Sequence, residues 1–357
     1  MPRIIQPMVS PRGRVIVLTG ATLGLIAAMV LSATPERAGA APGVGAFAAA
    51  TTTTLHSIEI IPGEDAMLYV PRVFADRAGG IYVTDKATPR VARLSRDLDP
   101  EATYGLGKGA GPGEMLRPRA VAVDSRGNVF VSDVRQQRIS KYAADGTFLK
   151  SVATTAVASL VVDAEDRLIG YPASGTALLQ RFTNDLEEDG RLLKKADRLQ
   201  HSSPLGVLIA MDGEGRLYLL DQFGLALGVY DRDMELISVW QVNPPLLRES
   251  IAMRRAAALK KAPEATLDLR VSGIQAMTVD PSGRHLAMAY MVTPAAGVSY
   301  SKIVWYSVGG EELHVEDRND VVYSIVLLAG GRIIEGSAEL LNVLERGPQP
   351  NTASSEN

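Results

Sequence analysis

Short runs of alternating apolar and polar residues, each ended by a turn, recur along the chain between residues 54 and 346. In each copy an apolar run leads into a polar, glycine-containing turn, and a second alternating run follows. A period of two predicts β-strands joined as hairpins, and no helical pattern alternates regularly with these runs. The chain is therefore predicted to be all-β.

The clearest copy covers residues 118–149. Its first two apolar runs, 118–123 and 129–133, flank the turn from Asp124 to Gly127, and a third run, 138–142, leads to the hairpin signal Asp145-Gly146 before a fourth. Turns of this kind favour residues that adopt a positive φ or bond to their own backbone. One copy thus predicts a four-stranded antiparallel module.

Six copies can be aligned on their first turn, at Asp76, Asp124, Asp163, Asp212, Asp280 and Leu328. Most neighbouring copies are about 40 to 50 residues apart, which is the length of a propeller blade. The sixth copy supplies only three strands before a polar tail, whereas residues 55–61 form an extra strand before the first copy. We expect this strand to complete blade six, because closure leaves no unpaired sheet edge at the seam.

The two ends of the chain are expected to lie outside the propeller, which spans residues 54–346. Residues 1–40 contain Arg3, Arg12 and Arg14 before the apolar run 15–31, and resemble an export signal or an uncleaved membrane anchor. Residues 41–53 are expected to be a flexible linker and residues 347–357 a disordered tail. The mature protein is predicted to be periplasmic or secreted, or membrane-anchored if the signal is not cleaved.

The interval between the fourth and fifth copies is longer than the others. Prolines bound the segment 246–261, in which Leu247, Ile251, Ala258 and Leu259 fit one helical stripe and several arginines and lysines fit the other face. We expect one inserted amphipathic helix here. It would cover a blade, cap the channel, dock a partner or lie on an anionic membrane surface.

Residues 104–151 resemble the NHL-repeat propellers, chiefly through the run 109–115, the strand 118–124, the segment 127–133 and the strand 138–142. The other copies fit this pattern more loosely. The resemblance implies a six-bladed propeller of the exported bacterial type that binds a protein or another ligand. A propeller fold alone does not fix a function.

The composition of the chain argues against several classes of function. The formal net charge is −3 without a basic block, so nucleic acid is not expected as a partner. Cysteine is absent, and the four histidines, His56, His201, His285 and His314, have no companion at metal-ligand spacing. We therefore predict no cofactor, no metal site and no catalytic residue, although propeller sites are assembled from residues distant in sequence.

Two other features have structural interpretations. The glycine-rich residues 105–111 superficially suggest a phosphate loop, but Pro112 follows and the Walker ending is missing, which favours a loop between blades. The aspartates that recur once per copy are expected to accept hydrogen bonds from turn amides.

Positions just before each innermost strand are more informative, because these strands line the central channel of a propeller and begin at one mouth. The side chains there differ between copies, as a ligand site would require; they are Arg72, Arg119, Ser159, Gln275 and Tyr323. Two arginines could hold a carboxylate or another anion by forked hydrogen bonds. The structural alternative is that they are solvated or paired with acids.

These observations favour an exported non-enzymatic binding propeller that recognises a protein, peptide or glycan at one mouth. A metal-dependent propeller lyase or hydrolase is one alternative, and a structural scaffold in an envelope complex is another. Membrane contact is expected only through an uncleaved N-terminal segment or the basic helix 246–261.

Overall fold

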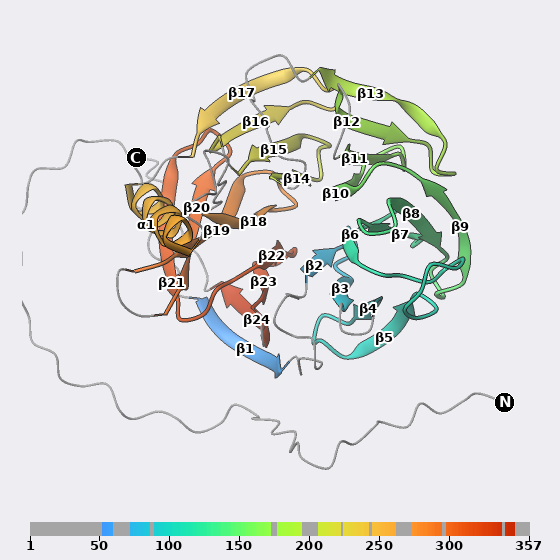
Figure 1. Ribbon diagram of the computed structural model, residues 1–357, viewed down its shortest axis with the longest axis horizontal. Coiled ribbons are helices and arrows are strands. Elements are labelled where there is room, and N and C mark those ends of the chain that lie inside the picture. The colour runs from blue at the N-terminus through green and yellow to red at the C-terminus, as the bar shows by residue number, and fades with distance from the viewer. Residues whose placement is uncertain are drawn as a thin grey trace, which may run out of the picture. The chain divides into compact units, whose positions relative to one another are not determined.

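The computed structural model describes residues 52–59, 72–85, 89–172, 177–194, 206–222, 224–242, 245–261, 273–294, 298–337 and 340–346. All of them belong to one unit of the chain, Phe47–Asn357. Within these residues, twenty-four strands form six four-stranded antiparallel sheets arranged around a ring (Figure 1). The predicted all-β, six-bladed propeller is confirmed.

The first three blades follow the chain without interruption, each running from an innermost to an outermost strand. Blade one comprises β2 (Arg72–Ala75), β3 (Ile81–Asp85), β4 (Arg90–Leu94) and β5 (Pro100–Tyr104). Blade two comprises β6 (Pro118–Val123), β7 (Val129–Asp133), β8 (Arg138–Tyr142) and β9 (Phe148–Ala153). Blade three comprises β10 (Val157–Val162), β11 (Leu168–Pro172), β12 (Ala177–Phe182) and β13 (Glu188–Lys194).

The last three blades keep this order, except that the outermost strand of blade six comes from the beginning of the chain. Blade four comprises β14 (Val207–Met211), β15 (Leu217–Asp221), β16 (Ala226–Tyr230) and β17 (Leu236–Gln241). Blade five comprises β18 (Ile274–Val279), β19 (His285–Val292), β20 (Tyr300–Ser307) and β21 (Glu312–Arg318). Blade six comprises β22 (Ser324–Leu327), β23 (Arg332–Gly336), β24 (Leu340–Arg346) and β1 (Thr52–Glu59).

The pairing of β1 with β24 closes the ring. The two strands are antiparallel, in register from Thr52 opposite Arg346 to Glu59 opposite Leu340, with one irregularity between Thr54 and His56. This confirms the predicted closure. The strand begins at Thr52, inside the segment expected to be a linker, and residues 60 and 61 of the predicted strand lie outside the described residues.

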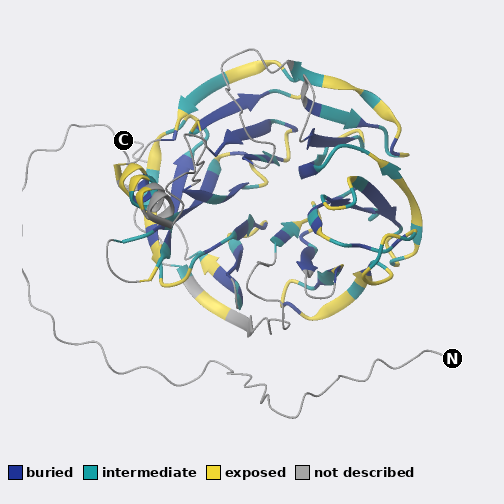
Figure 2. Ribbon diagram, viewed as in Figure 1, coloured by how far each residue is buried: buried dark blue, intermediate teal, exposed yellow. Residues whose placement is uncertain are grey.

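The hydrophobic core is divided into six wedges, one between each pair of neighbouring blades. Both faces of every blade therefore need apolar side chains, and the strands β7, β11, β15 and β16 are buried along their whole length. Figure 2 shows this burial in the middle strands and greater exposure along outer strands such as β9 and β17. Burial on both sides explains why the sequence of the middle strands is almost continuously apolar.

The six innermost strands contact one another in a closed circle, β2 to β6, β10, β14, β18, β22 and back to β2. Each presents one unpaired backbone edge toward the channel, and side chains of neighbouring blades satisfy several of these groups. The Ser324 hydroxyl accepts a hydrogen bond from the Val73 amide at 2.6 Å, and Gln222 Nε2 donates to the Ile274 carbonyl at 2.6 Å. These bonds fix the angular spacing of adjacent blades.

The inserted helix α1 (Pro245–Lys261) lies between blades four and five in sequence, as predicted. Leu247 is buried against blade five, and the Ser250 hydroxyl donates to the Met291 carbonyl at 2.9 Å and accepts from the Thr293 amide at 3.0 Å. The helix contacts β19 and lies toward the periphery of the ring (Figure 1). Its first half thus covers a blade, while the side chains of Ala258 and Leu259 are not among those described.

Three predicted segments lie outside the described residues, namely the export signal 1–40, most of the linker 41–53 and the tail 347–357. In the described part of the chain, no helix has the length and apolar character needed to cross a membrane.

Deleting residues 52–59 is expected to lower Tm by more than 10 °C and to broaden the melting transition, because blade six would lose its outermost strand and the ring its closure. Differential scanning calorimetry checks this. A matched deletion of residues 350–357 is expected to leave Tm unchanged. A normal melt of the variant that lacks residues 52–59 would contradict a closing role for β1.

Candidate ligand-binding site

The channel has two chemically different ends. The innermost strands begin at one end, which we call the arginine mouth and define by Arg72, Arg119, Ser159, Gln275 and Tyr323. They finish at the other end, the turn mouth, where the first turn of each blade lies. Because corresponding strands run in the same direction around the ring, equivalent residues of all six blades gather at each mouth.

Three residues of the arginine mouth lie in backbone irregularities. The register shifts between Pro118 and Ala120, between Val157 and Leu160, and between Ile274 and Ala276. Arg119, Ser159 and Gln275 fall inside these intervals. A β-bulge re-aims the side chain it contains without changing the alternation of the strand beyond it.

A cavity of about 380 Å³ occupies the channel, within the range of small-ligand sites. Arg72, Ser159 and Tyr323 line it at the arginine mouth, whereas Arg119 and Gln275 do not. In blade four the equivalent position is Leu208, which also lines the cavity. Hydrogen-bonding side chains from blades six, one and two therefore occupy one arc of the mouth, and the opposite arc includes an apolar residue.

Arg72 is the first residue of β2, and Arg119 is the second residue of β6. These two strands contact each other, and the positive charges of the two side chains repel. Burial, together with the positive charges of Arg119 and Arg117, lowers the pKa of Arg72 to about 9. Burial and the charge of Arg117 lower the pKa of Arg119 to about 10. Both guanidinium groups remain charged at neutral pH, and Arg119 Nε is buried without a hydrogen-bond partner among the described residues.

Three other arginines in the described part of the chain have close carboxylate partners. Arg216 Nε lies 2.7 Å from Asp212 Oδ2, and Arg167 Nε lies 2.8 Å from Asp163 Oδ2. Arg318 bridges Glu335 and Glu316 at 2.7 and 3.0 Å. By contrast, no described carboxylate contributes to the electrostatics of Arg72 or Arg119. The predicted alternative of pairing with acids is not observed within the described residues.

Arg117 is a member of the cluster that the sequence did not single out. It is exposed, and its backbone amide donates to the buried Asp133 carboxylate at 3.0 Å. Asp133 also accepts from the amides of Leu116, Arg135 and Gln136 at 2.6 to 3.0 Å. This carboxylate therefore fixes the segment that leads into β6 and its arginines, which agrees with the structural role predicted for the recurring aspartates.

The glycine-rich loop before Arg117 is an inter-blade loop, as predicted. Its amides bond within the loop: Gly109 N donates to the Met115 carbonyl at 3.0 Å, and Gly111 N to Glu114 Oε2 at 2.7 Å. Gln136 and Arg138 side chains donate to several of its carbonyls. The loop is thus held in place by its own contacts, and these amides are not free to cradle a phosphate.

The remaining predicted residues have different environments. The Ser159 hydroxyl accepts from the Ile209 amide at 3.4 Å, so it helps to join blades three and four. Gln275 already has an interaction within the protein. Tyr323 donates its amide to the Gly336 carbonyl at 2.9 Å and lines the cavity next to blade one. Their part in ligand binding stays a prediction.

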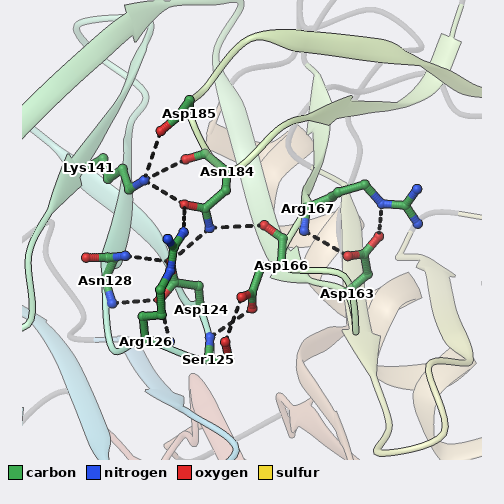
Figure 3. A network of polar contacts seen from close by, with 10 residues as sticks. All are labelled: Asp124, Ser125, Arg126, Asn128, Lys141, Asp163, Asp166, Arg167, Asn184 and Asp185. Atoms are coloured by element: carbon green, nitrogen blue, oxygen red, sulfur yellow. Dashed lines mark hydrogen bonds and ion pairs between the residues drawn. The ribbon is translucent and has the colours of Figure 1, made fainter.

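The turn mouth shows how charges are neutralised elsewhere. Asp124 accepts the amides of Arg126 and Asn128 at 2.9 and 2.8 Å, and Asp163 repeats this with the amides two and four positions later. Figure 3 shows the network that then joins blades two and three, in which Asn184 Nδ2 donates to Asp124 at 2.8 Å and the Lys141 ammonium donates to Asn184 Oδ1 at 2.7 Å. The recurring aspartates thus act structurally, as predicted.

Among the described residues, no group of three or more histidine, aspartate and glutamate side chains is placed to hold a metal ion. His285 Nδ1 lies 3.1 Å from Asp280 Oδ2, inside a blade-five turn. His201 lies outside the described residues.

No protein-family model and no curated protein sequence matches the chain. Solved structures do resemble it. A DUF4221 family member from Bacteroides vulgatus is similar with a TM-score of 0.53 at 9% identity, covering 83% of this chain and 98% of that one. An inactive virginiamycin B lyase variant from Staphylococcus aureus, solved with quinupristin, is similar with a TM-score of 0.50 at 12% identity. The match covers 83% of this chain and 99% of that one.

A third structure, of a Bacteroides fragilis protein predicted to be exported, gives a TM-score of 0.50 at 12% identity and covers 82% of this chain and 96% of that one. At these identities the likeness establishes the propeller fold alone.

Substituting Asn184→Ala is expected to destabilise the protein by about 1–3 kcal/mol, because the buried Lys141 ammonium and the Asp124 carboxylate each lose a hydrogen-bond partner. Urea unfolding followed by circular dichroism measures this. Asn184→Asp, which keeps an acceptor for Lys141 but faces Asp124 with a like charge, is expected to be at least as destabilising. Wild-type stability for both variants would contradict the role given to the network.

Substituting Arg72→Met is expected to raise Tm of the ligand-free protein by a few degrees at low ionic strength. Methionine keeps an unbranched apolar stem but removes one of the neighbouring positive charges. Thermal denaturation with and without 0.5 M NaCl measures the effect, and salt is expected to shrink the difference by screening. A fall in Tm at low salt would show instead that the Arg72 charge stabilises the fold.

Proposed function

We propose that the protein is an exported, non-enzymatic binding propeller that holds an anionic group of a protein, peptide or glycan ligand at the arginine mouth. The observation that carries this proposal is the pair formed by Arg72 and Arg119. Both are charged at neutral pH, both are only partly exposed, and neither has a described acidic partner. Like charges placed close together oppose folding unless an external anion neutralises them.

The scaffold supports a binding role. The ring supports the mouth, because the inner strands contact each other around a closed circle. The Asp133 carboxylate also accepts a hydrogen bond from the Arg117 amide and so holds the segment that leads into β6. A site that is already in place loses little conformational entropy when a ligand arrives. The variation of the mouth residues from blade to blade is what a site that faces one asymmetric ligand requires.

Three finer expectations belong to this proposal. Residues 1–40 carry the features of an export signal, which supports a location outside the cytoplasm. The likeness of residues 104–151 to NHL repeats supports a relationship with that family at blade two. The basic second half of α1 provides charge for contact with an acidic partner or membrane surface.

The experiment is isothermal titration calorimetry at pH 7.5 and constant ionic strength, with citrate and a tetraglutamate peptide as probes. Wild-type protein is expected to bind at least one of them, and Arg72→Gln or Arg119→Gln to weaken binding about 10- to 100-fold, since a hydrogen-bonded charge contributes about 1.5–3 kcal/mol. Arg191→Gln is the matched control, because Arg191 lies on the outermost strand of blade three and does not line the cavity. Equal affinity of the wild type and both mouth variants would reject this mouth as the site.

A further inference from the structure

A second cavity lies between blades five and six, beside the turn mouth. Its volume is about 500 Å³, within the range of small-ligand sites, and every residue that lines it belongs to the described part of the chain. It borders the channel, with which it shares Pro281, Leu327, Leu328 and Ala329. We call it the five–six cleft and define it by the lining residues Ser282, His285, Trp305, Gly330, Ile333 and Arg346.

The sequence of blade six explains why space remains at this place. Its first turn begins with Leu328, where the other five blades have an aspartate, and the third residue of the turn is Gly330. A Cβ atom added at Gly330 would have no neighbouring atom within 4 Å. Every other blade carries a side chain at the equivalent position; these residues are Ala78, Arg126, Glu165, Glu214 and Ser282.

The floor of the cleft is apolar. Leu327, Ile333 and Trp305 belong to the wedge of core between blades five and six, and they line the end of that wedge. Leu328, which is 5% exposed, adds a fourth apolar side chain. An apolar part of a ligand can pack here against apolar side chains, which favours binding of a molecule with an apolar body.

Polar groups gather on the blade-five side. His285 Nδ1 lies 3.1 Å from Asp280 Oδ2, and the Ser282 hydroxyl donates to the same oxygen at 2.8 Å. Burial acts to raise the pKa of Asp280, but hydrogen bonds from His285, Ser282 and the Arg284 amide lower it to about 2. Asp280 is therefore ionised at neutral pH, and His285 donates its Nδ1–H to the carboxylate.

Arg346 brings a flat cation to the cleft. Its guanidinium carbon lies 4.4 Å from the centre of the Trp305 ring, which is a cation–π distance. Burial lowers the pKa of Arg346, and nearby carboxylates, that of Asp280 among them, oppose this shift. Arg332, the other arginine that lines the cleft, donates to Asp97 Oδ1 at 3.2 Å. The charges around the cleft thus have opposite charges nearby, so a charged ligand would add one that is not compensated.

From these contacts we infer that the five–six cleft binds an uncharged aromatic molecule that carries a hydrogen-bonding group. An aromatic ring suits both the apolar floor and the guanidinium group stacked on Trp305. A hydroxyl or amide group suits the side formed by Ser282, Asp280 and His285, which offers donors and acceptors. The cleft is separate from the arginine mouth, so this inference does not depend on the proposed function.

Displacement of a fluorescent dye tests the charge and the ring of the ligand. The dye is N-phenyl-1-naphthylamine, an uncharged aromatic amine whose emission rises in apolar surroundings, used at pH 7.5 and constant ionic strength. Naphthalen-2-ylmethanol is expected to displace it at concentrations at least 10-fold lower than 2-naphthoate or naphthalen-2-ylmethylammonium, which add a charge to the same ring. Decahydro-2-naphthol, which lacks the aromatic face, is expected to compete about 3-fold more weakly than naphthalen-2-ylmethanol.

Substitutions locate the site. Ala329→Phe and Ser282→Phe add a ring at the cleft from blade six and from blade five, and each is expected to weaken dye binding at least 10-fold. Ala164→Phe is the matched control, because Ala164 has the position of Ala329 in the first turn of blade three and lines neither cavity. Ala75→Phe narrows the channel instead, since the exposed Ala75 lines only the channel cavity. Both controls are expected to bind the dye as the wild type does, and circular dichroism and Tm confirm that each variant is folded.

Trp305 provides a second measurement. The chain has two tryptophans, and Trp240 does not line the cleft, so Trp240→Phe leaves Trp305 as the single tryptophan. Its emission is expected to fall as the dye binds, because energy passes to the dye. Adding Ala329→Phe to this variant is expected to abolish the fall.

Each failure has a different meaning. If neither phenylalanine at the cleft weakens binding, or if only Ala75→Phe does, the cleft is not the site. If a charged naphthalene or the saturated alcohol competes as well as naphthalen-2-ylmethanol, the class of ligand is wrong. If only a variant that lacks residues 347–357 binds the dye, the tail of the chain itself is the occupant, and if no variant binds it the inference fails. None of these results bears on the titrations at the arginine mouth.

Discussion

The pairing of the first described strand with the last is the interaction on which the rest of the structure depends. The core of this protein is six apolar wedges between blades, so every wedge needs a blade on each side. Without β1 the sixth blade would end in an unpaired edge, and the wedges beside blade six would be the first to loosen. Both mouths are defined by the same circle of inner strands, so the closure of the sheet also determines the geometry of the site.

Charged side chains have different partners at the two mouths of the ring. At the turn mouth, carboxylates accept hydrogen bonds from backbone amides and from side chains such as those of Arg167 and Asn184. Each of these charges therefore stabilises a turn or links two neighbouring blades. At the arginine mouth, Arg72 and Arg119 have no described acidic partner, and neighbouring positive charges help to lower the pKa of both. The two mouths therefore differ in how their charges are neutralised by the described residues.

Much of the architecture was predictable, because it repeats. Six polar turns followed by alternating runs predicted six blades, and the missing strand of the sixth copy predicted the closure by β1. The site was less predictable. Arg72 and Arg119 could be selected as equivalent positions, but whether a described acid lies beside them depends on which side chains surround them in space. Arg117 was missed because it lies in a connection, where no periodic pattern marks the direction of a side chain.

The bulges at the beginnings of the inner strands have a consequence for how such a protein can change. Arg119, Ser159 and Gln275 occupy intervals where the pairing of the strands is already interrupted. A replacement there disturbs neither the ladder that follows nor the alternation that fills the wedges. Selection can therefore change these side chains while the scaffold drifts separately, so one ring can present different chemical groups at this mouth.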